Sequence, residues 1–207
     1  MTLKFDRYWL TLYICGLPLL WLLVDMVFNH LGADPIKALH VRLGDWSLRF
    51  LCITLAVTPV QKITRWRGMA DYRQLFGVYA FVYSTLHVLV YLTIDHGMQW
   101  QLIWIDVLES SYIWFGVIAF VIVFALGLTS TNAFKRWLGV YWKKLHRLIY
   151  IAIVAAVVHY FWQLKGNLAD PFMYAIFTLI LLGFRVLIWY GNQRLSKMMI
   201  PKGREDS

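Results

Sequence analysis

Six long apolar runs follow one another along the chain, separated by shorter polar segments. The runs cover residues 8–28, 47–60, 75–94, 112–128, 146–164 and 171–190. A helix needs roughly 20 residues to cross the hydrocarbon core of a bilayer, and tilting or local thinning absorbs small differences. The runs are continuous, whereas the strands of a membrane barrel would alternate. The pattern predicts an all-α polytopic membrane protein with six transmembrane helices in one domain over 1–207.

The second run is the shortest, and it holds two residues that are unusual inside a span. Arg49 carries a charge, and we expect its long side chain to extend toward the membrane surface. Pro59 predicts the end of the helix because proline has no backbone N–H to donate. Arg185, near the inner end of the sixth run, is expected to reach the surface as Arg49 does.

Composition supports lipid as the solvent. Hydrophobic residues make up 60% of the chain and charged residues only 15%, whereas about a quarter of a soluble domain is charged. Mean hydropathy is +0.60. Cys15 and Cys52 both lie in apolar runs without paired spacing, so we expect two buried thiols and no disulfide.

The net charge of +9 is distributed unevenly between the loops. Cationic side chains collect at every second loop, which indicates a cytoplasmic face and both termini in the cytoplasm rather than nucleic-acid binding. This group comprises Lys4, Arg7, Lys62, Arg65, Arg67, Arg73, Lys135, Arg136, Lys143, Lys144, Arg147, Arg194, Lys197, Lys202 and Arg204. The opposite face has Lys37, Arg42, Arg49 and Lys165.

The outer loops hold the remaining structural signals. Trp100–Leu108 is apolar but too short to span, so it predicts a short helix lying on the outer surface. The topology suggests that a partner protein docks on the outer loops, 31–46 and 96–111.

Histidines are the candidate chemical groups. His30, His40 and His96 fall in predicted outer loops, where a solvated side chain is the ordinary interpretation. His87 and His159 lie inside apolar runs, where ionisable groups are costly and usually functional. Both are ~17–18 Å from the inner edge of parallel spans, at ~1.5 Å per residue. Two imidazoles at one depth can bind one haem iron from opposite faces. A helix–helix hydrogen bond and a proton relay are the alternatives.

His146 is a third candidate ligand, for a second haem near the inner face. It lies thirteen residues before His159, so the two are about 140° apart around an ideal helix and do not share a face. The third run offers Gln74 rather than a histidine at the matching depth. A surface histidine among basic residues is therefore the alternative.

The basic residues around His146 are candidates for anion binding. Arg73, Lys143, Lys144 and Arg147 would pair haem propionates, a flavin phosphate or an acidic partner. The alternative is that they only set topology and attract anionic lipid. The chain has no dinucleotide-binding glycine motif, Walker A motif, nucleophile elbow or HExxH motif. Electrons would have to come from quinol or from a separate flavoprotein.

Several short motifs, in order along nearly the whole chain, resemble the MsrQ (YedZ-like) family. They are Asn29-His30-Leu31-Gly32-Ala33-Asp34-Pro35, Thr58-Pro59, Ser84-Thr85-Leu86-His87, Leu128-Thr129-Ser130-Thr131, Leu138-Gly139, Leu145-His146-Arg147-Leu148-Ile149-Tyr150 and His159-Tyr160. MsrQ proteins are the haem-binding membrane subunits of bacterial MsrPQ systems. The resemblance implies a ferric-reductase-like transmembrane domain in the bacterial inner membrane.

The resemblance also implies cofactors and partners. MsrQ-like proteins carry b haem, and flavin mononucleotide (FMN) is also associated with the family. His87, His146 and His159 match the family's histidine positions. Relatives with two haems have two histidines on the third span where this chain has one, so the expectation is one haem, with a second left open. Electrons would pass from the quinone pool or a cytosolic flavin reductase to MsrP, a periplasmic molybdopterin enzyme that repairs oxidised methionine in proteins.

The predicted function is thus that of a non-catalytic, haem-containing electron-transfer subunit. Two alternatives remain at this point. One is a stand-alone ferric or oxygen reductase, which would need an open acceptor site on the outer face. The other is a proton or solute transporter with a histidine relay, although few polar residues lie in the spans.

Overall fold

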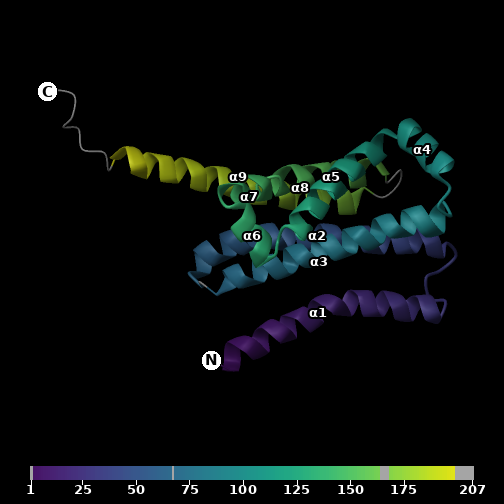
Figure 1. The fold of residues 1–207 in the computed structure, drawn as a ribbon, viewed down its shortest axis with the longest axis horizontal. Helices are drawn as coiled ribbons and strands as arrows, with labels where there is room; N and C mark the ends of the chain where they lie inside the picture. Colours follow the sequence, from purple (N-terminus) through teal and green to yellow (C-terminus); the bar gives the residue numbers. More distant parts are fainter. Residues whose placement is uncertain (1, 67, 164–167, 199–207) are drawn as a thin grey trace.

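The computed structural model describes residues 2–66, 68–163 and 168–198, and its regular elements in those ranges are all helical (Figure 1). Six segments there are long and apolar enough to span a membrane, which confirms the predicted number. The elements are α1 (Thr2–Val27), α2 (Pro35–Thr64), α3 (Met69–Val90), the π-helix η1 (Tyr91–Asp95), α4 (Trp100–Glu109), α5 (Ser111–Leu128), α6 (Asn132–Leu138), α7 (Val140–His146), α8 (Ile149–Gln163) and α9 (Ala169–Met198).

Two helix pairs form the centre of the bundle. α2 packs along α3, α5 packs along α8, and α3 also contacts α5. α9 lies against α2 and α8, and α1 is peripheral, against α2 and α3 (Figure 1). α1 begins and α9 ends at one end of the bundle, and α4 lies at the other (Figure 1). We call the α4 end the outer end, because the charge pattern predicts it to face away from the cytoplasm.

α2 is longer than the predicted 47–60 at both ends. It begins at Pro35, after Asp34, whose carboxylate accepts a hydrogen bond from the Lys37 backbone N–H at 3.0 Å. The charges that interrupt the apolar pattern are paired inside the bundle. Arg42 donates to Asp25 of α1, while Arg49 donates to the Tyr174 hydroxyl at 2.8 Å. The Arg49 side chain is still 41% exposed beside this contact, so its expected extension toward the membrane surface stays a prediction.

Pro59 does not end α2, and Arg185 explains why the helix can continue. Proline lacks the N–H that would bond the carbonyl four residues earlier, which is that of Leu55. The Arg185 guanidinium of α9 donates to this carbonyl at 3.0 Å and to the Tyr150 hydroxyl at 2.6 Å. Arg185 thus points into the bundle, which corrects the expectation that it reaches the surface.

The remaining span limits differ modestly from the prediction. The third span starts earlier, at Met69, and the fifth consists of α7 and α8 together. α9 extends past the predicted end at residue 190. The predicted end of the fifth span, Leu164, lies outside the described residues, as do Arg67, Lys165, Lys202 and Arg204. α4 confirms the predicted short helix.

The interior is small and the surface is strongly apolar. Ala80, Tyr83, Ala152 and Ile153 are at most 1% exposed, where α3 and α8 pack into the bundle. Tyr83 and Tyr79 donate to the Cys15 and Leu12 carbonyls of α1. Many large apolar side chains on the outside of the bundle are exposed, including Trp21 (70% exposed) and Leu187 (71% exposed). That surface suits lipid. Both cysteines are free thiols, as predicted, but only Cys15 is buried and Cys52 is half-buried.

Candidate functional site

A cavity of about 680 Å³ occupies the outer half of the bundle, within the range usual for ligand sites. α2, α3, η1, α4, α5 and α8 all contribute to its wall. Much of the wall is apolar, and the polar groups gather toward the outer end. The apolar part includes Leu48, Leu51, Val88, Val117, Phe120 and Val123; the polar part includes His40, His87, His159, Asp45, Asp95 and Asp106.

His87 and His159 meet across this cavity, as their equal depth predicted. Their ring centres are 6.4 Å apart and their planes are nearly perpendicular, at 84°. His87 comes from α3 and His159 from α8. Both rings are partly buried and both line the cavity. The two spans therefore bring the imidazoles together instead of turning them away from each other.

Each ring is oriented by a backbone carbonyl of a neighbouring helix. The Nδ1 atom of His87 is 3.0 Å from the His40 carbonyl oxygen, and that of His159 is 2.9 Å from the Tyr112 carbonyl oxygen. A carbonyl only accepts, so this geometry assigns the proton to Nδ1 in both rings. Nε2 then keeps its lone pair, which is the arrangement that metal-binding histidines use.

The ring separation fits a metal held between the two residues. With metal–nitrogen bonds of about 2 Å, imidazoles on opposite sides of one ion have centres roughly 6 Å apart. The observed 6.4 Å agrees. The donor set and the apolar wall also suit a haem iron and its porphyrin. The residues present therefore fit this group.

Two glycines make room for the rings. A Cβ atom on Gly116 of α5 would lie 2.8 Å from Nδ1 of His159, closer than real contacts allow. A Cβ on Gly44 of α2 would lie 3.4 Å from Nδ1 of His87, which is close but tolerable. Glycine at these positions lets each imidazole lie back against its neighbouring helix, which leaves the space in front of the ring open.

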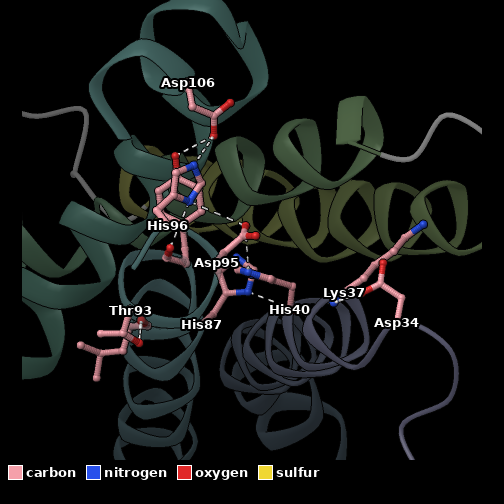
Figure 2. A network of polar contacts seen from close by, with 10 residues as sticks. Asp34, Lys37, His40, His87, Thr93, Asp95, His96 and Asp106 are labelled. Carbon is pink, nitrogen blue, oxygen red and sulfur yellow. Dashed lines mark hydrogen bonds and ion pairs between the residues drawn. The ribbon is translucent and has the colours of Figure 1, made fainter. Parts of the chain in front are cut away.

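A second polar group closes the outer end of the cavity (Figure 2). His40 Nε2 is 3.4 Å from the Asp95 carboxylate, and the His40 ring packs edge-on against His87 at 5.3 Å. His96 Nε2 is 3.5 Å from Asp106, which also accepts a hydrogen bond from the Tyr91 hydroxyl at 2.7 Å. These contacts join α2, η1 and α4 in one network.

The positions of His40 and His96 correct the expectation of solvated loop histidines. Their side chains are only 11% and 16% exposed. His40 lies on α2 because the helix begins well before the apolar run. His96 follows η1, a π-turn that widens the helix and is frequent at functional sites. His30, at 68% side-chain exposure, is solvated as predicted.

The candidate residues near the inner face do not come together around a shared space as His87 and His159 do. His146 ends α7, stacks on Trp142 with ring centres 3.9 Å apart, and has Nδ1 3.1 Å from the Trp142 carbonyl oxygen. Gln74 donates to the Ser130 carbonyl instead of facing this ring. All six histidines lie in the described ranges, and none of the other five has a ring contact with His146 there. Arg73 and Arg147 are exposed.

Comparison with known proteins gives the family. Residues 43–157 match the model described as "Ferric reductase like transmembrane component". A Caulobacter vibrioides protein named "Protein-methionine-sulfoxide reductase heme-binding subunit MsrQ" is 35% identical over 95% of this chain and 91% of its own length. The chain belongs to the MsrQ family. The MsrQ protein of Polaromonas naphthalenivorans is 39% identical over 87% of this chain and 84% of its own length. That of Brucella anthropi is 36% identical over 91% of this chain and 85% of its own length. No solved structure matches this MsrQ-family chain significantly.

Family membership confirms the resemblance seen in the motifs, and with it the ferric-reductase-like transmembrane class. The family-model match includes His87 and His146 but ends before His159. The outer network of His40, Asp95, His96 and Asp106 was missed by sequence reasoning in this MsrQ-family chain. Its only sequence signal was the spacing Tyr91, Asp95, His96, which places polar side chains together just past the end of an apolar run.

Proposed function

We propose that this protein holds b-type haem between His87 and His159 and carries electrons across the bacterial inner membrane. The observation that carries the proposal is the pair of imidazoles 6.4 Å apart, each with Nδ1 on a backbone carbonyl. The relatives are named as haem-binding subunits, which supports it independently. When bound, haem supplies one-electron redox chemistry that the side chains lack.

The protein's own residues act by binding and by exclusion. His87 and His159 would hold the haem iron from two helices, and with both bound the metal would offer no free place to oxygen or another small ligand. Gly44 and Gly116 set the rings back, and the carbonyls of His40 and Tyr112 fix their rotation. The apolar wall excludes water from the site. This arrangement favours electron transfer over catalysis at the metal.

The family resemblance and the predicted topology support a particular donor and acceptor. Electrons enter at the inner face from quinol or a cytosolic flavin reductase and leave at the outer face. The acceptor is an MsrP-like periplasmic molybdopterin reductase that repairs methionine sulfoxide in proteins. The subunit is non-catalytic in this scheme, and the membrane lipid is its solvent.

His146 forms the inner part of the proposal, as the ligand of a second haem or as part of the entry site. Its ring is hydrogen-bonded to the backbone carbonyls of Trp142 and Leu126, so binding a metal would require it to give up one of these contacts. Arg73 and Arg147 would pair with propionates or with the phosphate of FMN. The His146→Ala protein is expected to keep the outer haem.

The first experiment is an optical one. The protein is purified from haem-replete cells, its dithionite-reduced minus oxidised spectrum is recorded, and haem is counted per polypeptide. We expect a b-type spectrum that disappears in His87→Ala and His159→Ala. A folded but colourless wild-type protein would refute the proposal.

A second experiment identifies the acceptor. The reduced protein is mixed in a stopped-flow instrument with a periplasmic MsrP-type reductase, with ferric chelate or with oxygen, and haem reoxidation is timed. Fast reoxidation by the reductase alone supports the electron-transfer subunit. Fast reoxidation by ferric chelate or oxygen would indicate a stand-alone reductase instead.

A further inference from the structure

α4 covers the outer end of the cavity instead of lying free on the surface. Its inward side, with Ile103, Asp106 and Val107, contributes to the cavity wall, and Ile103 is only 8% exposed. Figure 1 shows α4 beyond the outer ends of α3 and α5, and Figure 2 shows Asp106 above the histidine network. Moving α4 away would therefore widen the access to the cavity from the outer end.

Asp106 is the main polar attachment of α4 to the bundle among the described residues. Its carboxylate accepts from the Tyr91 hydroxyl at 2.7 Å and lies 3.5 Å from His96 Nε2. Its second oxygen accepts from the Ser110 hydroxyl at 3.1 Å. Tyr91 and His96 come from η1 and the residue after it, so one carboxylate connects α4 to the end of the third span.

The segments on both sides of α4 are shaped as turns. Gly97 and Met98, just before it, both have positive φ, at 54° and 60°. Ser110, just after it, is extended, with φ −104° and ψ 95°. α4 is thus a short rigid piece between two bends, and it packs mainly against the start of α5. Besides the packing of Ile103, the polar contacts of Asp106 hold it against the bundle.

The outward side of α4 carries two large aromatic side chains. Trp100 and Trp104 are 63% and 62% exposed, and Leu108, one further turn along, is 57% exposed. Trp114 and Trp162, at the outer ends of α5 and α8, are also exposed. Indole rings favour the lipid–water boundary, so the tryptophans of α4 continue a belt that the spans already form.

The charge of α4 identifies the kind of surface it meets. The chain has no lysine or arginine between Arg73 and Lys135, and the only charged residues of α4 are Asp106 and Glu109. Attraction to anionic lipid needs cationic side chains, which are absent from this stretch. Apolar burial of the tryptophans must provide the binding.

We propose that α4 is a cap over the haem cavity, latched from inside by Asp106 and held from outside by the outer lipid–water interface. The inference rests on the proposed haem site and adds how the cofactor is retained. Breaking the latch should release haem faster, and the tryptophan flank should be in lipid whether or not the lipid is anionic.

The latch is tested on the haem-loaded protein in nanodiscs, by timing haem transfer to excess apomyoglobin. Asp106→Ala and the milder Tyr91→Phe are expected to release haem about tenfold and a few-fold faster than wild type. Glu109→Gln, on the same helix but outside the latch, should release haem at the wild-type rate. Equal rates in Tyr91→Phe and wild type would overturn the latch, even if Asp106→Ala fails to fold.

The lipid contact is tested with a bimane label at Trp104→Cys or Glu109→Cys, in a Cys15→Ala/Cys52→Ala background. These positions are about 140° apart around the helix. Nitroxide lipid in phosphatidylcholine nanodiscs should quench the label at 104 much more than at 109, and added phosphatidylglycerol should change neither. Equal quenching, or protection at 104 only after addition of an MsrP-type reductase, would overturn the lipid assignment. A protein that never binds haem refutes the proposed function, whereas a haem-bound protein that fails these tests refutes only the cap.

Discussion

The imidazole of His159 lies directly against the backbone of Gly116, where a single added methyl would be 2.8 Å from Nδ1. His87 has a looser version of the same relationship with Gly44, at 3.4 Å. An alanine at either position would press against a candidate histidine ligand, severely at 116 and mildly at 44, so the two substitutions form a matched pair.

Gly116→Ala should displace the His159 ring and weaken haem binding. Overpacking of this kind costs about 1–3 kcal/mol, which corresponds to roughly fivefold to hundredfold weaker retention. Gly44→Ala should keep most of its haem because its contact needs only a small shift. Haem per polypeptide after purification measures both. Full haem content in Gly116→Ala would contradict the assigned role of His159.

Gly127→Ala should destabilise the fold without touching the site. Its Cβ would clash with the ring of Phe81, where α5 crosses α3. We expect a loss of about 1–3 kcal/mol in the free energy of unfolding, with an unchanged haem spectrum in the folded fraction. Thermal unfolding in detergent gives the first value and the reduced spectrum the second. A changed spectrum would mean that this contact is coupled to the site.

His40→Ala and His96→Ala should keep the b-type spectrum. Both residues are in the outer network, but His40 orients His87 through its backbone carbonyl, which the substitution preserves. The comparison is with His87→Ala, where the spectrum should vanish. If His40→Ala alone abolished haem binding, its side chain would have to be a ligand.

Arg185 and Pro59 should be energetically coupled. Arg185→Met removes the donor to the Leu55 carbonyl and should destabilise the protein by about 1–3 kcal/mol. Pro59→Ala restores a backbone N–H for that carbonyl, so the loss should be smaller in the double variant, by about 1 kcal/mol. The free energy of unfolding in detergent is measured for the wild type, the two single variants and the double variant, which together form a double-mutant cycle. Strictly additive effects would show that Arg185 does not compensate for the proline.

The orientation of the chain is open to direct labelling. In a background without Cys15 and Cys52, Gln99→Cys should react with an impermeant maleimide added to intact cells. Asn132→Cys should react only after the membrane is opened, because the basic loops are predicted to be cytoplasmic. The opposite pattern would invert the proposed direction of electron flow.

The apolar pattern predicted the six spans because lipid imposes long continuous runs. It failed at α2, where Arg42 and Arg49 interrupt the apolar pattern but are paired with Asp25 and Tyr174. Such pairings join residues far apart in the chain, so a local window does not detect them. For the same reason Arg185 was assigned to the surface.

The site was predictable only where depth alone determines it. His87 and His159 lie in unbroken runs on parallel spans, and counting residues places them level. The approach of Asp95, His96 and Asp106 depends on the π-turn and on the bend at Gly97, neither of which has a reliable local signal. The ligand roles of His87, His146 and His159 remain predictions until the cofactor is measured.

The carbonyl bonds that orient the two imidazoles tie the site to the alignment of whole helices. His87 is held by α2 and His159 by α5, so sliding either pair of helices by one turn would rotate a ring away from its partner. Side chains at positions 40 and 112 can vary without breaking these bonds. The spacing of the helices, rather than the side chains at 40 and 112, sets the direction of both rings, so the spectrum of a bound haem would report on that spacing.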